Sequence, residues 1–319
     1  MNFWIGKKVV VTGGAGLIGS HLTEALVQKG ATVSVVDNLK RGDLRNLQKV
    51  RPDIEFRHED LTDPEVCARS CRGKDVVFHL ASDAYGLSYS YTHHGEILTN
   101  NILLNTNVLK AAHECAAERV LLVSSSCVYP DHAPVPTKES EGFSGEPETA
   151  NIGYGWSKRI LEIQAAHYHR DYGMKIAVVR PANVYGPRDP IQGKGTHVIP
   201  SLIHRVIFEE GPVIVWGSGQ QVRNFIHVKD MVNAILLIAE KRDYPEPVNV
   251  GSAQATSIKE LIDKIVELTG SPKEIVFDTS KPEGAHRKDV DISLMKKVIG
   301  FEPAISLEEG LKETIDYYK

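Results

Sequence analysis

Residues 12–19 read TGGAGLIG, a glycine-rich turn between an apolar run and an amphipathic stretch. The preceding run, Lys8–Thr12, is typical of a buried strand, and His21–Lys29 has the pattern of a helix. Because glycine lets the backbone turn sharply and approach a phosphate, this arrangement predicts a dinucleotide site at the helix N-terminus. The glycines fit two spacings, GxxGxxG and GxGxxG, and both stay open. The predicted cofactor contacts in this turn are Gly13, Gly16, Leu17, Ile18 and Gly19.

Short β-branched runs continue to alternate with longer amphipathic stretches along the chain. Further strands are predicted at Thr32–Val36, Val76–Leu80, Val120–Ser124 and Lys175–Val179, and long helices at Thr99–Ala117 and Tyr154–Tyr172. This alternation predicts an α/β protein with a Rossmann doubly wound parallel sheet. Prolines and glycines increase after Pro181, where the chain is expected to leave the first domain. We predict an NAD-binding domain at 1–180, rejoined by about 222–250, and a smaller α/β C-terminal substrate lobe at 181–221 and 251–319.

The composition excludes several classes of protein. The 319 residues are 42% hydrophobic and 24% charged, with a formal net charge of -4, which is ordinary for a globular protein and gives no basic footprint for nucleic acid. No apolar run approaches the roughly 18 residues that cross a bilayer, and the start is too quickly charged for a secretory signal. We expect a soluble, cytoplasmic protein without a nucleic-acid or membrane partner. The four cysteines favour neither a disulfide scaffold nor a metal site.

An acidic residue ends the second predicted strand and points to the type of cofactor. A carboxylate at Asp37 accepts hydrogen bonds from both ribose hydroxyls of NAD and repels the 2′-phosphate of NADP. Arg41 lies near enough to favour a phosphate, but Asp37 makes NAD the predicted cofactor. The alternative for Asp37 is a solvated loop acid. Further cofactor contacts are expected from Asn38, Asp60, Leu61, Leu80 and Ala81.

Tyr154 and Lys158 form a YxxxK pair on a predicted helix, where a spacing of four puts both side chains on one face. The ammonium of Lys158 and the positive nicotinamide would lower the pKa of Tyr154, so that the phenol acts as base and acid near neutral pH. By itself the spacing fits a solvated pair equally well. The serine run 124–126 adds a hydroxyl at the carboxyl end of a predicted parallel strand, where such sheets bind ligands.

Together, the glycine turn, Asp37, the serine run, YxxxK and RPANVYGP (180–187) resemble the extended short-chain dehydrogenase/reductase family over nearly the whole chain. The resemblance implies chemistry on a nucleotide-diphosphate sugar and a homodimer formed through the two long helices. By motif position, Ser125 matches the catalytic Ser/Thr of the family. Asn101 matches an asparagine that supports the cofactor site.

The motifs also separate branches of this family. Its dehydratases carry an Asp-Glu pair after the catalytic Ser/Thr, where this chain has Ser126 and Cys127, so dehydration is not expected. SSCVYP (125–130) and THVIP (196–200) instead resemble GDP-fucose synthase and GDP-mannose 3,5-epimerase. This likeness implies that Cys127 and His197 act as base and acid beside a ketone, with Lys194 as another candidate acid. The alternatives are a buried apolar cysteine and a hydrogen-bonded loop histidine.

The likeness extends to VWGSGQQVRNFIHVKD (215–230) and KPEGAHR (281–287), which resemble the nucleotide-binding stretches of this branch. Arginine suits these positions because its planar fork of donors matches a diphosphate. The predicted substrate-binding residues are Ser125, Ser126, Asn183, Lys194, His197, Arg205, Arg223 and Arg287.

We therefore expect an NAD-dependent nucleotide-sugar epimerase that works through a transient 4-keto sugar. Epimerisation at carbons 3 and 5 of a GDP-sugar would use Cys127 and His197, whereas epimerisation at carbon 4 of a UDP-sugar would leave Cys127 as packing. The alternative enzyme is an NADP-dependent 4-keto-6-deoxy sugar epimerase-reductase. A non-catalytic NAD-sensing scaffold is a third class, but such proteins often lose the catalytic Tyr, Lys or Ser, and all three are present.

Overall fold

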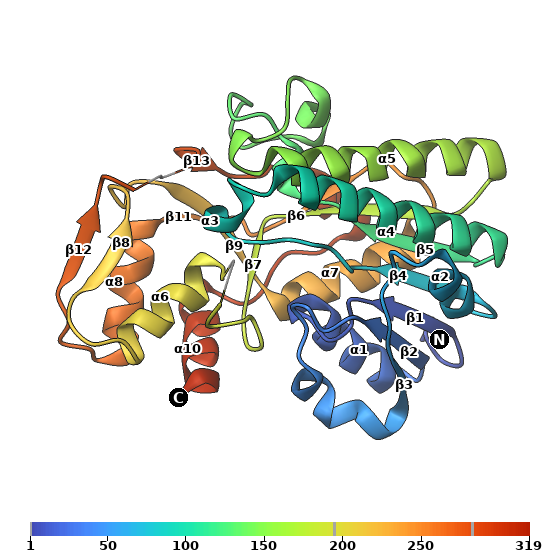
Figure 1. Ribbon diagram of the computed structural model, residues 1–319, viewed down its shortest axis with the longest axis horizontal. Helices are drawn as coiled ribbons and strands as arrows, with labels where there is room; N and C mark the ends of the chain where they lie inside the picture. Colours follow the sequence, from blue (N-terminus) through green and yellow to red (C-terminus); the bar gives the residue numbers. More distant parts are fainter. Residues whose placement is uncertain (1, 194–195, 282–283) are drawn as a thin grey trace.

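The computed structural model describes residues 2–193, 196–281 and 284–319 (Figure 1). At its centre is a seven-stranded sheet in the order β10-β6-β5-β4-β1-β2-β3, and every neighbouring pair is parallel. The strands are β1 (Lys8–Thr12), β2 (Thr32–Asp37), β3 (Ile54–His58), β4 (Val76–His79), β5 (Arg119–Val123), β6 (Ile176–Pro181) and β10 (Val248–Val250). The strand order reverses between β1 and β4, as in a doubly wound nucleotide-binding sheet. This confirms the predicted fold class.

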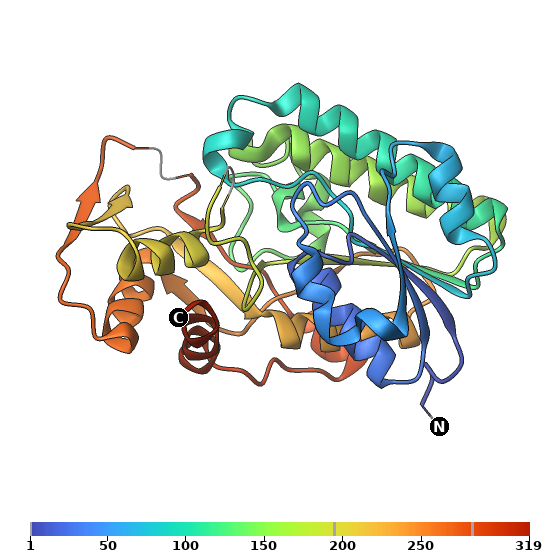
Figure 2. The same cartoon turned by 60° about the horizontal axis from the view of Figure 1, so that its bottom comes forward.

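Helices cover both faces of the sheet (Figure 2). One layer consists of α2 (Pro64–Cys71), α4 (His94–Glu114) and α5 (Ile152–Tyr172), and the other of α1 (Leu17–Gln28), α7 (Val228–Lys241) and α9 (Ser293–Ile299). Each layer has its own apolar core against the sheet. The short helices between these elements are η1 (Leu44–Asp53), α3 (Leu87–Ser90), η2 (Ser126–Val128), η3 (Glu139–Phe143) and η4 (Thr149–Asn151).

Two of the predicted helices begin too late. Helix α1 begins at Leu17 rather than His21, because Gly16 is its extended N-cap and the glycine turn runs straight into the helix. Helix α4 begins at His94 rather than Thr99. In both cases the first helical turn contains glycine and polar residues that have a low helix propensity, so the sequence did not predict it. Tertiary contacts can override such propensities.

A smaller lobe lies beside the sheet (Figure 1) and has a separate apolar core. Its strands are β7 (Asn183–Tyr185), β8 (Val213–Trp216), β9 (Val222–His227), β11 (Ala255–Ser257), β12 (Ile275–Asp278) and β13 (Arg287–Lys288), and its helices are α6 (Val198–Ile207), α8 (Ile258–Thr269) and α10 (Leu307–Tyr318). Helices α8 and α10 each begin with a capping box, which satisfies two backbone N–H groups reciprocally. Of the segment 222–250, β9 pairs within this lobe, whereas β10 joins the large sheet.

Within the described ranges, no helix combines the length and apolar composition that would let it span a bilayer. The same ranges contain no group of three or more His, Cys, Asp or Glu side chains placed to hold a metal ion.

A buried ion pair fixes α5 against the ends of the central strands. Arg180 donates two hydrogen bonds to Glu162, with Nε–Oε1 and Nη2–Oε2 distances of 2.8 and 2.6 Å. Ser124 donates a third to the same carboxylate at 2.5 Å. Arg180 also donates to the phenol of Tyr129 at 3.0 Å, and that phenol donates to Asn249 on β10 at 2.5 Å. The network therefore joins α5 to β5, β6 and β10.

Replacing Glu162 by Gln should destabilise the protein strongly. The change leaves the buried guanidinium of Arg180 without its counter-charge, which costs about 3–5 kcal/mol in comparable buried pairs. The matched control is Glu65→Gln, because the Glu65 side chain is 86% exposed in a loose pair with Arg69 and such a pair contributes under about 1 kcal/mol. Urea unfolding of both variants measures the difference. Equal losses would contradict a structural role for the buried pair.

Candidate active site

A cavity of about 750 Å³ lies between the sheet and the smaller lobe, within the range of small-molecule sites. It brings together residues from the glycine turn, the ends of the central strands, helix α5 and the lobe. The predicted site residues that line it are Gly13, Gly16, Leu17, Ile18, Gly19, Leu80, Ser125, Ser126, Cys127, Tyr154, Lys158, Asn183, His197, Arg205 and Arg223. Lys194 lies outside the described residues.

The glycine turn has no room for side chains at three positions, Gly13, Gly14 and Gly19. Gly13 has a φ of +68°, and a Cβ there would lie 2.8 Å from the backbone of Ala81. A Cβ at Gly19 would press against the carbonyl oxygen of Gly13. The turn therefore offers an unobstructed backbone at the N-terminus of α1, where a pyrophosphate is favoured by free N–H groups and the helix dipole. These residues fit a dinucleotide.

Asp37 holds the turn from the end of β2. Its carboxylate accepts hydrogen bonds from the N–H groups of Ala15 and Leu39, at 2.9 and 2.8 Å. Burial raises the pKa of Asp37, and these two N–H groups act in the opposite direction. The side chain is buried and does not line the cavity, but a carboxylate has about four acceptor positions, so two remain. The nearby Asn38 donates to Asp60 at 2.9 Å.

The other predicted cofactor residues shape the loop that follows β4. The hydroxyl of Thr12 accepts from the N–H groups of Leu80 and Ala81, at 3.1 and 3.2 Å. Asn101 is fully buried, and its amide oxygen accepts from the Ser82 hydroxyl at 2.8 Å. Asn101 therefore supports the site through this loop and not as part of the cavity wall. Leu61 is buried outside the cavity as well.

Tyr154 and Lys158 both face the cavity from α5. The ammonium of Lys158 lies 5.5 Å from the centre of the Tyr154 ring and donates to the carbonyl of Val123 at 2.8 Å. Burial lowers the pKa of Lys158 to about 7, and the carboxylate of Glu162 opposes that shift. The lysine is thus fixed to the end of β5 beneath the phenol.

The predicted lowering of the Tyr154 pKa needs both Lys158 and a bound nicotinamide; in the protein without a nucleotide the pKa is shifted in the opposite direction. Burial raises the pKa of Tyr154 above its ordinary value, while hydrogen bonding with Ser82 and Ser125 acts the other way. The reason is that the ammonium bonds to a backbone carbonyl, so desolvation of the phenol dominates. The phenol is therefore protonated at neutral pH.

Ser125 and Cys127 lie in the short turn that follows β5. The hydroxyl of Ser125 caps η2 by accepting from the N–H of Cys127 at 3.1 Å. Lys288 and Glu148 also line the cavity, and no sequence motif predicted either residue. The ammonium of Lys288 lies 3.8 Å from the sulfur of Cys127 and 2.5 Å from the carboxylate of Glu148. Lys288 directly follows the stretch 281–287. Its partners Cys127 and Glu148 are distant in sequence, so no local pattern predicts their contact.

His197 lies at the N-cap of α6 and forms an ion pair with Asp189. The distance from His197 Nδ1 to Asp189 Oδ2 is 2.9 Å, and Asp189 is buried. The negative charge of Asp189 raises the pKa of His197, against the effect of burial. The imidazolium is thereby favoured, as an acid at this position requires.

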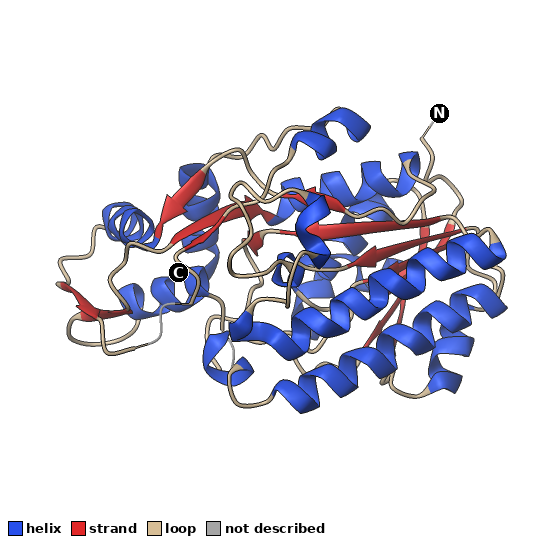
Figure 3. Cartoon of the chain, turned by 90° about the horizontal axis from the view of Figure 1, so that it is seen from above, coloured by secondary structure: helices blue, strands red, loops and turns tan. Residues whose placement is uncertain are grey.

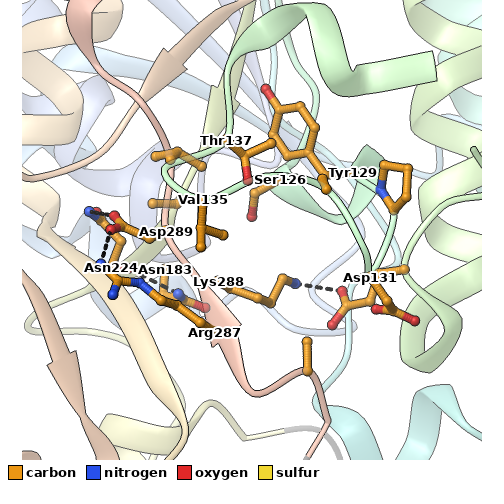
Figure 4. A pocket seen from close by; sticks show the side chains of 16 residues that line it. Ser126, Tyr129, Asp131, Val135, Thr137, Asn183, Asn224, Arg287, Lys288 and Asp289 are labelled. Atoms are coloured by element: carbon orange, nitrogen blue, oxygen red, sulfur yellow. Dashed lines mark hydrogen bonds and ion pairs between the residues drawn. The ribbon is translucent and has the colours of Figure 1, made fainter. Parts of the chain in front are cut away.

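The three predicted arginines do not share one location. Arg205 and Arg223 line the large cavity; Arg205 donates to the carbonyl of Ile214, and Arg223 comes from β9. Arg287 instead lines a smaller adjoining pocket together with Ser126, Asn183 and Lys288 (Figure 4). It donates to Asp289 at 2.9 Å. The structure therefore does not place Arg287 against the main cavity.

The geometry of the glycine turn fits a dinucleotide, and comparison with known proteins agrees with this. Residues 9–251 match the model of the NAD dependent epimerase/dehydratase family. The chain is 34% identical to a probable GDP-L-fucose synthase 1 of Oryza sativa subsp. japonica, over 98% of this chain and 92% of that protein. It is 30% identical to GDP-mannose 3,5-epimerase 1 of the same organism, over 100% and 84% of the two chains. These relatives confirm the resemblance inferred from the motifs.

A solved structure with the same fold is the UDP-glucose 4-epimerase of Thermotoga maritima, in complex with UDP-glucose. It is 33% identical to this chain, covers 98% of both chains and superposes with a TM-score of 0.89. The relatives thus include enzymes named for three different reactions, and they agree on the fold and on nucleotide-sugar substrates.

Gly19→Ala should weaken binding of a dinucleotide. The added methyl group meets the carbonyl of Gly13, and strain of about 1–3 kcal/mol corresponds to about 5- to 150-fold in affinity. The control is Gly95→Ala in α4, where a Cβ meets nothing within 4 Å. Titration with NAD, followed by calorimetry, measures both. Undiminished affinity of the Gly19 variant would remove the turn from the cofactor site.

Proposed function

Because the chain belongs to the NAD dependent epimerase/dehydratase family, we propose that it is an epimerase of nucleotide-diphosphate sugars that retains its NAD. The observation that carries this proposal is the shared cavity. One space contains the glycine turn, the phenol of Tyr154, the thiol of Cys127 and the imidazole of His197. A simple ketone reductase needs only the first two, whereas inversion beside a ketone, in an epimerase or an epimerase-reductase, also needs a base and an acid.

The dinucleotide would lie along the glycine turn, with Asp37 at its ribose and Tyr154 near its reactive ring. When bound, NAD accepts a hydride from carbon 4 of the sugar and returns it after rearrangement. Asp37 supports NAD over NADP, because a buried carboxylate repels a 2′-phosphate.

Tyr154 exchanges a proton with the hydroxyl on carbon 4. The phenol must lose its proton first, and a positive charge brought close to it favours that loss. Lys158 keeps a second cation beneath the ring. Ser125, which lines the same cavity as the phenol, positions the sugar hydroxyl. In the reverse direction Tyr154 returns the proton to the new alkoxide.

Cys127 and His197 would invert a carbon next to the ketone. The ketone acidifies the adjacent C–H bonds. The thiolate of Cys127 forms an S–H bond with the proton, and the electron pair moves into an enolate. His197, charged through its pair with Asp189, returns a proton to the other face of that carbon. The ketosugar is then reduced, and no reductant is consumed.

Two other reactions remain distinct candidates. Simple carbon-4 epimerisation is favoured by the likeness to the UDP-glucose 4-epimerase, and it leaves Cys127 without a chemical role. A 4-keto-sugar epimerase-reductase is favoured by the relatives named GDP-L-fucose synthase. Such an enzyme would consume one NADPH for each sugar, and Asp37 opposes that cofactor.

Solvent deuterium and the fate of the cofactor together separate these reactions. The purified protein, with its bound small molecules identified by mass spectrometry, is incubated with GDP-, UDP-, dTDP- and CDP-sugars in deuterated water. We expect retained NAD and deuterium at carbon 3 or 5 of the converted sugar. Cys127→Ser should abolish that incorporation, and Tyr154→Phe should lower turnover about 10²- to 10⁴-fold while NAD stays bound.

The contrary outcomes either identify one of the other two reactions or exclude all three. Turnover without deuterium at carbons 3 and 5 would remove Cys127 from the mechanism. Stoichiometric consumption of NADPH would establish the reductase. Full activity of the Tyr154→Phe variant would contradict all three reactions, because each needs the phenol.

We also propose a homodimer through the paired helices α4 and α5. The two helices lie side by side on one face of the sheet (Figure 3). Their outward surface exposes Leu103, Trp156, Ile163 and Tyr172 by 37–58%. Exposed apolar side chains gathered on one helix pair are typical of an interface between subunits.

Ile163→Arg should convert the dimer into a monomer, because a charge placed in an apolar interface is desolvated without a partner. The matched control is Ile5→Arg, since Ile5 is 69% exposed and lies outside both helices. Analytical ultracentrifugation gives the mass of each variant. A dimeric Ile163→Arg protein would place the interface elsewhere.

A further inference from the structure

Three ionisable side chains meet at one wall of the cavity, apart from the glycine turn. The side chain of Lys288 on β13 extends into this region, and its ammonium forms an ion pair (Figure 4). Its Nζ lies 2.5 Å from Glu148 Oε2 and 3.8 Å from Cys127 Sγ. Cys127 follows β5, Glu148 precedes η4 and Lys288 belongs to the lobe. The fold therefore joins a thiol, a cation and an anion from three separate segments.

We propose that Lys288 and Glu148 are positioning residues that set the protonation state of Cys127, an inference that rests on the proposed function. Lys288 stabilises the thiolate. Glu148 holds the ammonium of Lys288 in place and, through its own negative charge, opposes formation of the thiolate.

The contacts of Glu148 make this arrangement rigid. The carboxylate is buried and also accepts from the amide of Asn151 at 3.0 Å. The backbone N–H of Glu148 donates to the carbonyl of Cys127 at 3.3 Å. The anion is thus fixed to the turn that carries the thiol. Lys288 is only 20% exposed, so its charge acts on the sulfur with little screening by water.

The charges around the sulfur act in opposite directions. Burial raises the pKa of Cys127 to about 11; the Lys288 ammonium lowers it and the Glu148 carboxylate raises it. The other ionisable groups that face it are Tyr154 and Lys158 of α5 and Arg223 of β9. At neutral pH the thiol therefore keeps its proton. On ionisation that proton passes to water, and the thiolate pairs with Lys288.

The test is the pH dependence of alkylation of Cys127 by iodoacetamide, resolved by peptide mass spectrometry on the purified protein. Alkylation follows the thiolate fraction. Lys288→Met should raise the apparent thiol pKa by about one unit, which slows the reaction about tenfold below that pKa. Glu148→Gln keeps an acceptor for Lys288 but removes the charge, so it should lower the thiol pKa and speed alkylation. Shifts of opposite sign are the expected result.

Several controls separate tuning from structural damage. Lys288→Arg should restore most of the wild-type profile, because it keeps the positive charge. Cys115, half-buried with its thiol directed at the carbonyl of Ala68, should react equally in all variants. An unchanged profile in Lys288→Met, or shifts of the same sign in both variants, would overturn the proposal. The assay contains no sugar, so shifted profiles without deuterium exchange in the wild type would reject only the proposed epimerisation.

Discussion

The buried carboxylate of Glu162 is the interaction on which the arrangement of the site depends. It accepts hydrogen bonds from Arg180 and Ser124, and its charge supports the ammonium of Lys158 one helical turn away. One carboxylate thus compensates the charges of two buried cations, Arg180 and Lys158. Without it, the desolvation of Lys158 and Arg180 would be uncompensated, and α5 would lose its buried ion pair with β6. Because Tyr154 belongs to α5, the position of its phenol depends on the position of that helix.

In the cavity, the phenol of Tyr154 and the thiol of Cys127 rest in their neutral, protonated forms. Burial raises the pKa values of both Tyr154 and Cys127, and it lowers that of Lys158 to about 7. Chemistry at such a site requires charge brought by the ligands, because a positive ring beside the phenol favours the phenolate. The free protein thereby avoids reactive anions, and under the proposed function binding of the cofactor would prepare the phenol for proton transfer.

Local patterns in the sequence predicted much of this arrangement. The glycine turn, Asp37 and YxxxK each occupy one short segment, so the sheet and the placement of Tyr154 and Lys158 on one side of a helix could be predicted from spacing. Glu148 and Lys288 could not be predicted from local patterns. They contact Cys127 or each other only because the lobe places β13 against the turn after β5. The direction in which the Tyr154 pKa is shifted in the free protein could not be predicted for a related reason: burial is a property of the folded chain, and helical spacing does not reveal it. The placement of Arg287 in the adjoining pocket likewise depends on the path of the lobe.

The central claim is that a dinucleotide in the glycine turn and a sugar at Tyr154 meet in one crevice. The most direct measurement is a crystal structure of the protein with NAD and a bound nucleotide sugar. The account predicts the pyrophosphate against Gly13–Gly19, and the Tyr154 oxygen within about 3 Å of the hydroxyl on carbon 4, a hydrogen-bond distance. A dinucleotide bound elsewhere, or a sugar ring held away from the Tyr154 phenol, would contradict it.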